Sequence, residues 1–273
     1  MKKLLASFLC LIMLTSMVSF ALSENAAVSA YPTLTEGKLT VGTGEPAWVP
    51  WVIDDNPESG EGFEAALVYA IAERLGYAPE NVVWVRTQFE EAIQPGPKNF
   101  DFNLQQYSVT EERKAVVDFS TPYYKEPLAV VVKADGAFAD ASSIADLKDA
   151  LFGAASGDIA VMYTQDNIQP TTQIQVYNDL AAVAQALNAG QIDALVAGIT
   201  TADYITESQV DNGKVVGVLK NSENVAEGLA LVFDKDSALT PIVSAVIDGM
   251  IEDGSLEELM KLWLGQYDVP TLE

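Results

Sequence analysis

Through most of the chain, short apolar runs alternate with segments in which apolar residues recur every three or four positions. The clearest periodic segment carries Phe63, Leu67, Ile71 and Leu75, and Gly76 follows it. This spacing places the apolar side chains on one face of a helix, and a glycine after the last turn is a common helix end. The short apolar runs are typical of strands. The alternation therefore predicts an α/β fold.

The predicted elements form two series, of which the second is inserted into the first. The predicted strands lie at 39–41, 82–85, 102–104, 127–132, 151–155, 174–176, 194–197, 215–219 and 228–233. Helical segments separate most of them, and two helices close the chain, one around residues 242–250 and one from residue 255. The second series begins near residue 143 and ends before the strand at 228–233.

The N-terminus has the pattern of a secretory signal peptide. Two lysines precede an apolar stretch over residues 4–22, and small residues permit cleavage after Ala21 or Ala30. A retained membrane anchor is the alternative, because a stretch of this length nearly spans a bilayer. We expect residues 1–21 to be removed on export and residues 22–37 to form a flexible leader.

Charge and composition exclude several classes of function. The chain has 15 Lys and Arg against 39 Asp and Glu, a formal net charge of −24, which argues against binding to nucleic acid. It has no histidine, and its single cysteine, Cys10, lies in the predicted signal peptide. These facts exclude a Ser-His-Asp triad, a Cys-His dyad and a His- or Cys-ligated metal site. Neither a dinucleotide-binding fingerprint nor a Walker A sequence is present, and we expect no cofactor.

One basic residue is a candidate for ligand binding. Arg113 ends the segment Ser-Val-Thr-Glu-Glu-Arg that begins at Ser108, after a predicted strand. Thr110 is a candidate N-cap and Glu111 a first-turn acid, so the segment predicts a turn and then a short helix. An arginine here can donate two parallel hydrogen bonds to a ligand carboxylate. The alternative is a surface ion pair with Glu111 or Glu112.

This segment and Val117–Tyr124 (VDFSTPYY) resemble the S-I-T-x-E-R…V-D-F-S-x-P-Y-Y motif of the extracellular solute-binding proteins of amino-acid ABC importers, family 3. The resemblance covers residues 38–265. It implies a two-lobed, periplasmic-binding-protein-like (type II) α/β fold, with two open mixed sheets flanked by helices and a two-strand hinge. By this resemblance, residues 38–130 and 227–273 form lobe 1, and residues 131–226 form lobe 2.

The resemblance also implies a function. The chain is expected to be a periplasmic or extracellular monomer that captures a small carboxylate-bearing solute, an amino acid or a related compound, in the cleft between the lobes. Its partners would be the transmembrane permease subunits of an ABC importer, and it would not be an enzyme. Two alternatives remain: an enzyme on the same scaffold, similar to cyclohexadienyl or arogenate dehydratases, and a degenerate sensor or binding module.

The family's ligand contacts can be carried over residue by residue. Arg113 is expected to bind the ligand carboxylate, with help from the Ser108 hydroxyl. Gln106 aligns where the family often has glycine, and its backbone carbonyl is expected to receive the ligand ammonium group. Trp48 and Trp51 lie in the aromatic segment before the first helix. Each is expected either to cover the ligand side chain or to belong to the core.

Two positions depart from the family pattern. Gly157 matches the glycine of a G-T-T loop whose backbone amides are expected to complete the carboxylate site, but Asp158 replaces the first threonine. Gly198 stands where the family usually has the aspartate that pairs with the ligand ammonium group. An unpaired buried ammonium group is costly, so either Asp158 or Glu45 replaces that aspartate or the ligand is not an ordinary α-amino acid. Alternatively, Asp158 only caps the helix that it begins.

Overall fold

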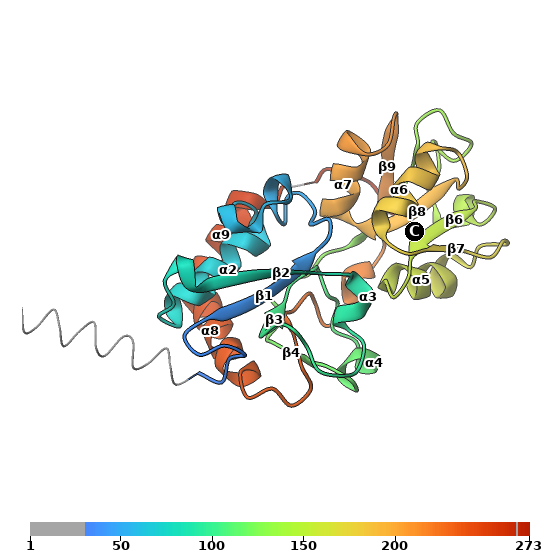
Figure 1. Cartoon of the computed structure of the whole chain (residues 1–273). Coiled ribbons are helices and arrows are strands. Elements are labelled where there is room, and N and C mark those ends of the chain that lie inside the picture. The colour runs from blue at the N-terminus through green and yellow to red at the C-terminus, as the bar shows by residue number, and fades with distance from the viewer. Residues whose placement is uncertain (1–30, 266) are drawn as a thin grey trace, which may run out of the picture.

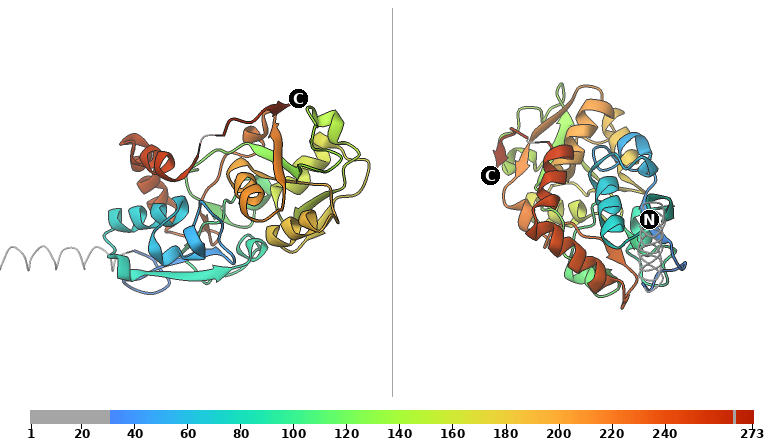
Figure 2. Two further views of the ribbon diagram at one scale, coloured as in Figure 1. Left: turned by 90° about the horizontal axis from the view of Figure 1, so that it is seen from above. Right: turned by 90° about the vertical axis from the view of Figure 1, so that its left-hand side faces the viewer.

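The computed structural model describes residues 31–265 and 267–273, so the predicted signal peptide and most of the leader lie outside the described residues. Two β-sheets, each with helices packed against it, form two lobes (Figure 1). Seen from above, the lobes lie side by side (Figure 2). In the described part of the chain, no helix is long and apolar enough to cross a membrane.

The first lobe is built on a five-stranded sheet with the order β2-β1-β3-β10-β4. Its strands are β1 (Leu39–Gly44), β2 (Val82–Thr87), β3 (Phe102–Asn103), β4 (Asp118–Phe119) and β10 (Val232–Phe233). β1 is parallel to β2 and β3, and β10 is antiparallel to β3 and β4. The helices of this lobe are α2 (Phe63–Arg74), α3 (Phe89–Ala92), α4 (Glu111–Lys114), α8 (Thr240–Glu252) and α9 (Ser255–Trp263).

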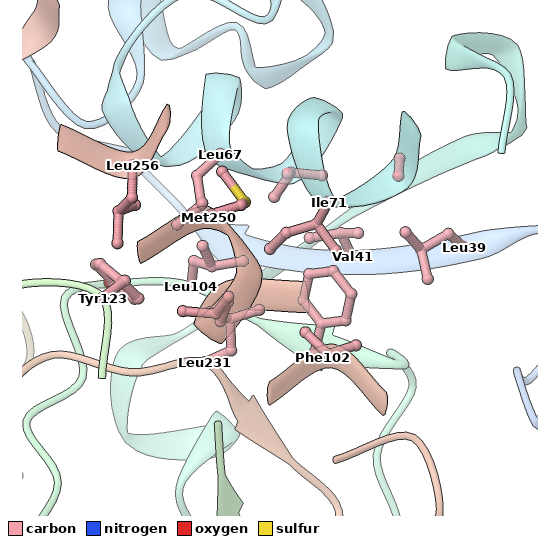
Figure 3. Packing of buried hydrophobic residues seen from close by; sticks show 14 of the residues in the cluster. Leu39, Val41, Leu67, Ile71, Phe102, Leu104, Tyr123, Leu231, Met250 and Leu256 are labelled. Atoms are coloured by element: carbon pink, nitrogen blue, oxygen red, sulfur yellow. The ribbon is translucent and has the colours of Figure 1, made fainter. Parts of the chain in front are cut away.

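The core of the first lobe lies between its sheet and the long helices (Figure 3). Leu67 and Ile71 of α2 are fully buried and lie above Val41 of β1. Met250 of α8 and Leu256 of α9 belong to the same cluster. The four-residue spacing that predicted α2 therefore marks the face that packs on the sheet, which explains why this helix was predicted within one residue of its observed bounds.

The second lobe is built on a six-stranded sheet with the order β11-β9-β5-β8-β6-β7. Its strands are β5 (Leu128–Lys133), β6 (Phe152–Ala155), β7 (Gln175–Tyr177), β8 (Ala194–Gly198), β9 (Gly213–Leu219) and β11 (Thr271–Leu272). Its helices are α5 (Ile159–Tyr163), α6 (Leu180–Asn188) and α7 (Ile199–Ser208), and the π-helical turn Thr164–Ile168 continues α5. Short 3₁₀ turns in the two lobes lie at Ile53–Asp55, Pro57–Ser59, Pro79–Asn81, Ile144–Leu147 and Ser222–Asn224.

The central strand β5 is covered on both faces. Val130 and Val132 belong to one hydrophobic cluster, whereas Ala129 and Val131 belong to the cluster on the other face. Successive side chains of a strand point to opposite faces, so a strand buried on both faces has an unbroken apolar sequence. This burial accounts for the continuous apolar run at 127–132.

The end of the chain requires a correction to the predicted lobes. The first lobe was expected to include every residue from 227 to 273, with two connections between the lobes. Instead, β11 pairs in parallel with β9 of the second sheet, and Leu272 is fully buried in the second lobe. The chain therefore passes between the lobes a third time after α9. A strand of two residues is too short to show a periodicity in the sequence.

The predicted strand at 228–233 is also shorter than expected. Only Val232 and Phe233 form a regular strand, because Leu229 makes isolated bridges with Ser108 and Tyr124 instead of a continuous ladder. These bridges hold the segment before β10 against the loop that carries Ser108.

Candidate binding site between the lobes

A pocket lies between the two lobes and is lined by residues from both. The first lobe contributes the segment after β1, the segment after β3, and side chains of α2, α3 and α4. The second lobe contributes residues at the ends of β6, β7 and β8 or just after them, including Asp158, Asp179 and Gly198. In open α/β sheets, ligands bind beyond the carboxyl ends of the strands. The pocket occupies this position in both sheets.

Arg113 contacts both lobes at this pocket. The Thr110 side chain accepts a hydrogen bond from the Arg113 backbone N–H at 3.2 Å, so Thr110 is the N-cap of α4, as predicted. The buried Arg113 guanidinium donates to the Ser108 carbonyl of the first lobe and to the Gly157 carbonyl of the second, each at 2.7 Å. Its Cζ atom lies 5.5 Å from the centre of the Phe89 ring, within the range of a cation–π interaction.

The charge of Arg113 has no direct counterion among the described residues. No described carboxylate lies within ion-pair distance of the guanidinium, and Glu111, the expected surface partner, pairs with Lys114 instead. Burial lowers the pKa of Arg113, while the nearby Asp158 acts in the opposite direction. A guanidinium has five N–H donors, and the two carbonyls use two of them, so three remain for an anion.

The loop at the start of α5 differs from the expectation in one respect. Asp158 is the N-cap of α5 and accepts a hydrogen bond from the Ala160 N–H at 2.9 Å, and it also lines the pocket. Burial raises the pKa of Asp158, and Arg113 partly opposes this shift. Gly157 does not line the pocket, and its carbonyl, rather than its amide, meets Arg113. Because Gly157 has a φ of 74°, the backbone here is in the left-handed region that glycine adopts readily.

The two tryptophans have different positions. Trp48 lines the pocket and makes an edge-on contact with Tyr204, with ring centres 6.0 Å apart. Trp51 is fully buried, does not line the pocket and packs against Phe63. The Trp51 Nε1–H donates to the Thr201 hydroxyl at 3.0 Å. Of its two expected roles, Trp51 therefore has the one in the core, and it joins the core of the first lobe to α7 of the second.

Gln106 is held by a buried carboxyl group that the sequence did not single out. The Gln106 N–H and side-chain amide donate to the two oxygens of Glu64 at 2.9 and 2.6 Å. The Tyr123 hydroxyl donates to Glu64 as well. Burial raises the pKa of Glu64 to about 7, against the effect of these hydrogen bonds. Gln106 has a φ of 53°, so its backbone takes the conformation that a glycine adopts at little cost.

A second carboxyl group that the sequence did not single out, Glu126, lies against Gly198. A Cβ atom at position 198 would lie 2.0 Å from Glu126 Oε2 and 2.5 Å from Cδ, so the carboxyl group fills the space of a side chain there. Glu126 Oε1 accepts a hydrogen bond from the Thr200 N–H at 2.7 Å, in the first turn of α7. Burial raises the pKa of Glu126 to about 7.

The two acids that were expected to replace a carboxylate at position 198 line the pocket, but neither lies against Gly198. Asp158 caps α5 near Arg113, and Glu45 is exposed at the edge of the pocket. Glu126 precedes β5, on the segment that joins the two lobes. Among 39 acidic residues, nothing in the local sequence distinguishes it.

The pocket is strongly acidic. Arg113 carries the only positively charged side chain among the described residues that line it. Its carboxyl groups belong to Glu45, Glu64, Glu126, Asp158, Asp179 and Glu223. Even so, no three His, Cys, Asp or Glu side chains in the described part of the chain are grouped so that they could hold a metal ion.

Comparisons with known proteins agree with this geometry. The family of bacterial extracellular solute-binding proteins, family 3, matches residues 39–266. An L-arginine-binding protein of Pseudomonas aeruginosa is 27% identical over 251 residues, covering 89% of this chain and 94% of that protein. A probable histidine-binding protein of Campylobacter jejuni is 29% identical over 272 residues, covering 96% of this chain and 98% of that protein.

A solved structure also resembles the chain over both lobes. An ancestral arginine-binding protein bound to arginine superposes with a TM-score of 0.67 at 28% identity, covering 84% of this chain and 99% of that chain. This solved protein therefore shares with the chain both the two-lobed fold and a related sequence.

The contact between Gly198 and Glu126 predicts a specific coupling. Gly198 has φ −54° and ψ 141°, which alanine tolerates, so Gly198→Ala adds only the Cβ atom that displaces the flexible Glu126 carboxyl group. We expect the lost hydrogen bond to Thr200 to lower the free energy of unfolding by about 0.5–1.5 kcal/mol. The same substitution in a Glu126→Ala background should be close to neutral. Urea unfolding of the four proteins measures this coupling, and an equal cost in both backgrounds would contradict the placement of Glu126.

The buried Glu64 predicts a dependence of stability on pH. Between pH 5 and 7 the folded protein keeps a proton on Glu64 that the unfolded chain has released, because folding raises this pKa from 4.5 to about 7. Unfolding therefore releases a proton, and the free energy of unfolding falls as the pH rises through this range. Glu64→Gln should remove this component, about 3 kcal/mol for such a shift.

Urea unfolding at pH 5, 6, 7 and 8 tests the second prediction. The difference in stability between the unaltered protein and Glu64→Gln should decrease as the pH rises. Glu252→Gln, at an exposed carboxyl group at the end of α8, is the control and should leave the pH dependence unchanged. Parallel curves for the unaltered protein and Glu64→Gln would show that Glu64 is ionised in the folded protein throughout.

Proposed function

The chain belongs to the bacterial extracellular solute-binding proteins, family 3, and on that basis we propose that it captures an amino acid with a basic side chain for an ABC importer. The named relatives are binding proteins rather than enzymes, and the function is that of a solute-binding component. The amino acid would bind in the pocket between the lobes. The basic side chain is inferred from the carboxyl groups that line this pocket.

The observation that carries this proposal is the state of Arg113. A buried guanidinium without a direct counterion is unfavourable, because burial removes the water that stabilises the charge. Arg113 has three N–H groups left after its two carbonyl contacts. A ligand carboxylate can accept a bidentate pair of hydrogen bonds from such a group. The carboxylate of an amino acid therefore fits the charge and the donors at this end of the pocket.

The remaining charge of the pocket favours a basic side chain. Even without Glu64 and Glu126, whose pKa values are raised to about 7, four carboxyl groups line the pocket against one guanidinium, so a zwitterionic ligand leaves negative charge uncompensated. A second cationic group on the ligand reduces this imbalance. The relatives from Pseudomonas aeruginosa and Campylobacter jejuni are named for the amino acids arginine and histidine, which supports an amino acid as the ligand.

The contacts between the lobes fit capture by closure. Besides the Arg113–Gly157 hydrogen bond, Trp51 donates to Thr201 at 3.0 Å and the Ser156 hydroxyl donates to Glu90 at 2.7 Å. A ligand held by groups of both lobes stabilises the closed arrangement relative to an open one. We further propose that the closed, monomeric protein presents its ligand to the transmembrane permease subunits outside the cytoplasm.

A panel of solutes tests the proposed function. L-arginine, L-lysine and L-histidine should raise the thermal unfolding temperature, and L-glutamate and L-glutamine should raise it less. Arg113→Ala should weaken binding of the basic amino acids by about 2–5 kcal/mol in calorimetric titration, because the buried carboxylate loses its bidentate partner. Arg74→Ala removes an arginine that pairs with Asp253 outside the pocket and should leave the affinity unchanged. An unaltered protein that binds no amino acid would contradict the proposal.

A further inference from the structure

We propose that Glu126 binds the ammonium group of the ligand and thereby makes the protein select amino acids over simple carboxylates. This inference rests on the proposed function, since it concerns the same pocket. Arg113 is the proposed partner of the ligand carboxylate. The positively charged α-ammonium group of an amino acid still has no assigned partner.

The position of the Glu126 carboxyl group is set by its neighbours. Its Oε1 accepts from the Thr200 N–H at 2.7 Å, and its other oxygen lies 2.0 Å from the point where a Cβ atom of residue 198 would be. Glycine at 198 therefore leaves space that the carboxyl group occupies at the pocket wall. Glu126 thus presents a carboxylate from the segment between the lobes at the N-terminus of α7, where the first-turn N–H groups favour negative charge.

Glu126 has hydrogen-bonding capacity that the described residues do not use. Its Oε2 atom accepts no hydrogen bond and forms no ion pair with a described residue, whereas the carboxyl group as a whole can accept about four. A carboxylate that is removed from water and has a single donor is unfavourable. A ligand ammonium group supplies both the opposite charge and the missing donors.

The fully buried carboxyl group of this region, that of Glu64, is differently placed. Glu64 is 2% exposed and already accepts three hydrogen bonds, two from Gln106 and one from the Tyr123 hydroxyl. It therefore acts as a support for Gln106. After burial, which is the larger cause, repulsion between the ionised forms of the two groups contributes to the raised pKa of Glu126. A cation beside Glu126 therefore favours its ionised form.

Asp158 and Asp179 are less suited to this role. Asp158 caps α5 beside the positive charge of Arg113, and Asp179 caps α6 by accepting from the Ala182 N–H at 2.8 Å. An ammonium group at Asp158 would lie close to the guanidinium and be repelled by it. Glu126 is therefore the carboxyl group whose surroundings fit the ligand amine best.

The test compares a ligand that has the amine with one that lacks it. L-arginine and 5-guanidinopentanoate share the carboxylate and the guanidinium but differ in the α-amino group. We expect Glu126→Gln to weaken the binding of L-arginine about 10- to 100-fold in calorimetric titration, the range for a hydrogen-bonded charged group. Binding of 5-guanidinopentanoate should change less than about twofold on the same scale. Glu126→Asp keeps the charge but shortens the side chain, and should weaken L-arginine by an intermediate factor.

Two controls keep the outcomes distinct. Glu207→Gln removes an exposed carboxyl group from the same helix, α7, and should change neither affinity. The melting temperature of Glu126→Gln without ligand shows whether the variant is folded. If the unaltered protein binds no amino acid, the proposed function fails. If it binds L-arginine but Glu126→Gln weakens both compounds equally, or neither, the function stands and the assignment of Glu126 is overturned.

Discussion

The guanidinium of Arg113 is the group on which the arrangement between the lobes depends. It is buried, it donates to one backbone carbonyl in each lobe, and it has no direct ion-pair partner among the described residues. The short helix that carries it begins at Thr110, whose side chain accepts a hydrogen bond from the Arg113 backbone N–H. The sequence of this helix thus fixes a cation at the boundary of two lobes. Under the proposed function, a carboxylate that enters the pocket would satisfy this charge and contact a group that already joins the lobes, so binding and closure would favour one another.

Among the acidic groups that line the pocket, two carboxyl groups have different surroundings. Glu64 is saturated by hydrogen bonds from Gln106 and Tyr123 and keeps Gln106 in a left-handed conformation. Glu126 has one donor and lies in space that Gly198 leaves open. Loss of contact with water raises the pKa of each to about 7. A cationic ligand would favour the ionised form of Glu126, whereas the hydrogen bonds of Glu64 serve the protein itself.

Much of the fold could be predicted from the sequence because it depends on local periodicity. The helix at 63–75 and the apolar run at 127–132 reflect packing on one face and burial on both faces, respectively. The strand β11 could not be found, because two residues show no period and its partner β9 lies some fifty positions earlier in the chain.

The site was predictable only where a motif fixes it. The segment that ends at Arg113 contains its own N-cap, so its local structure follows from its sequence. Trp48 and Trp51 could not be told apart, because they lie in an irregular loop where no period assigns one to the core. Glu126 was missed because its role comes from a contact with Gly198, 72 positions away in the chain. A glycine where a side chain is expected was the one sign in the sequence that another group fills the space.

The central claim is that an amino acid lies between the lobes with its carboxylate on Arg113 and its amine on Glu126. A crystal structure of the protein with L-arginine tests this claim most directly. The account predicts carboxylate oxygens at about 2.7–3.2 Å from the Arg113 nitrogens and the α-amino nitrogen at a similar distance from Glu126 Oε2. A ligand bound in the reverse orientation, or with its amine on Asp158 and Glu126 unengaged, would contradict it.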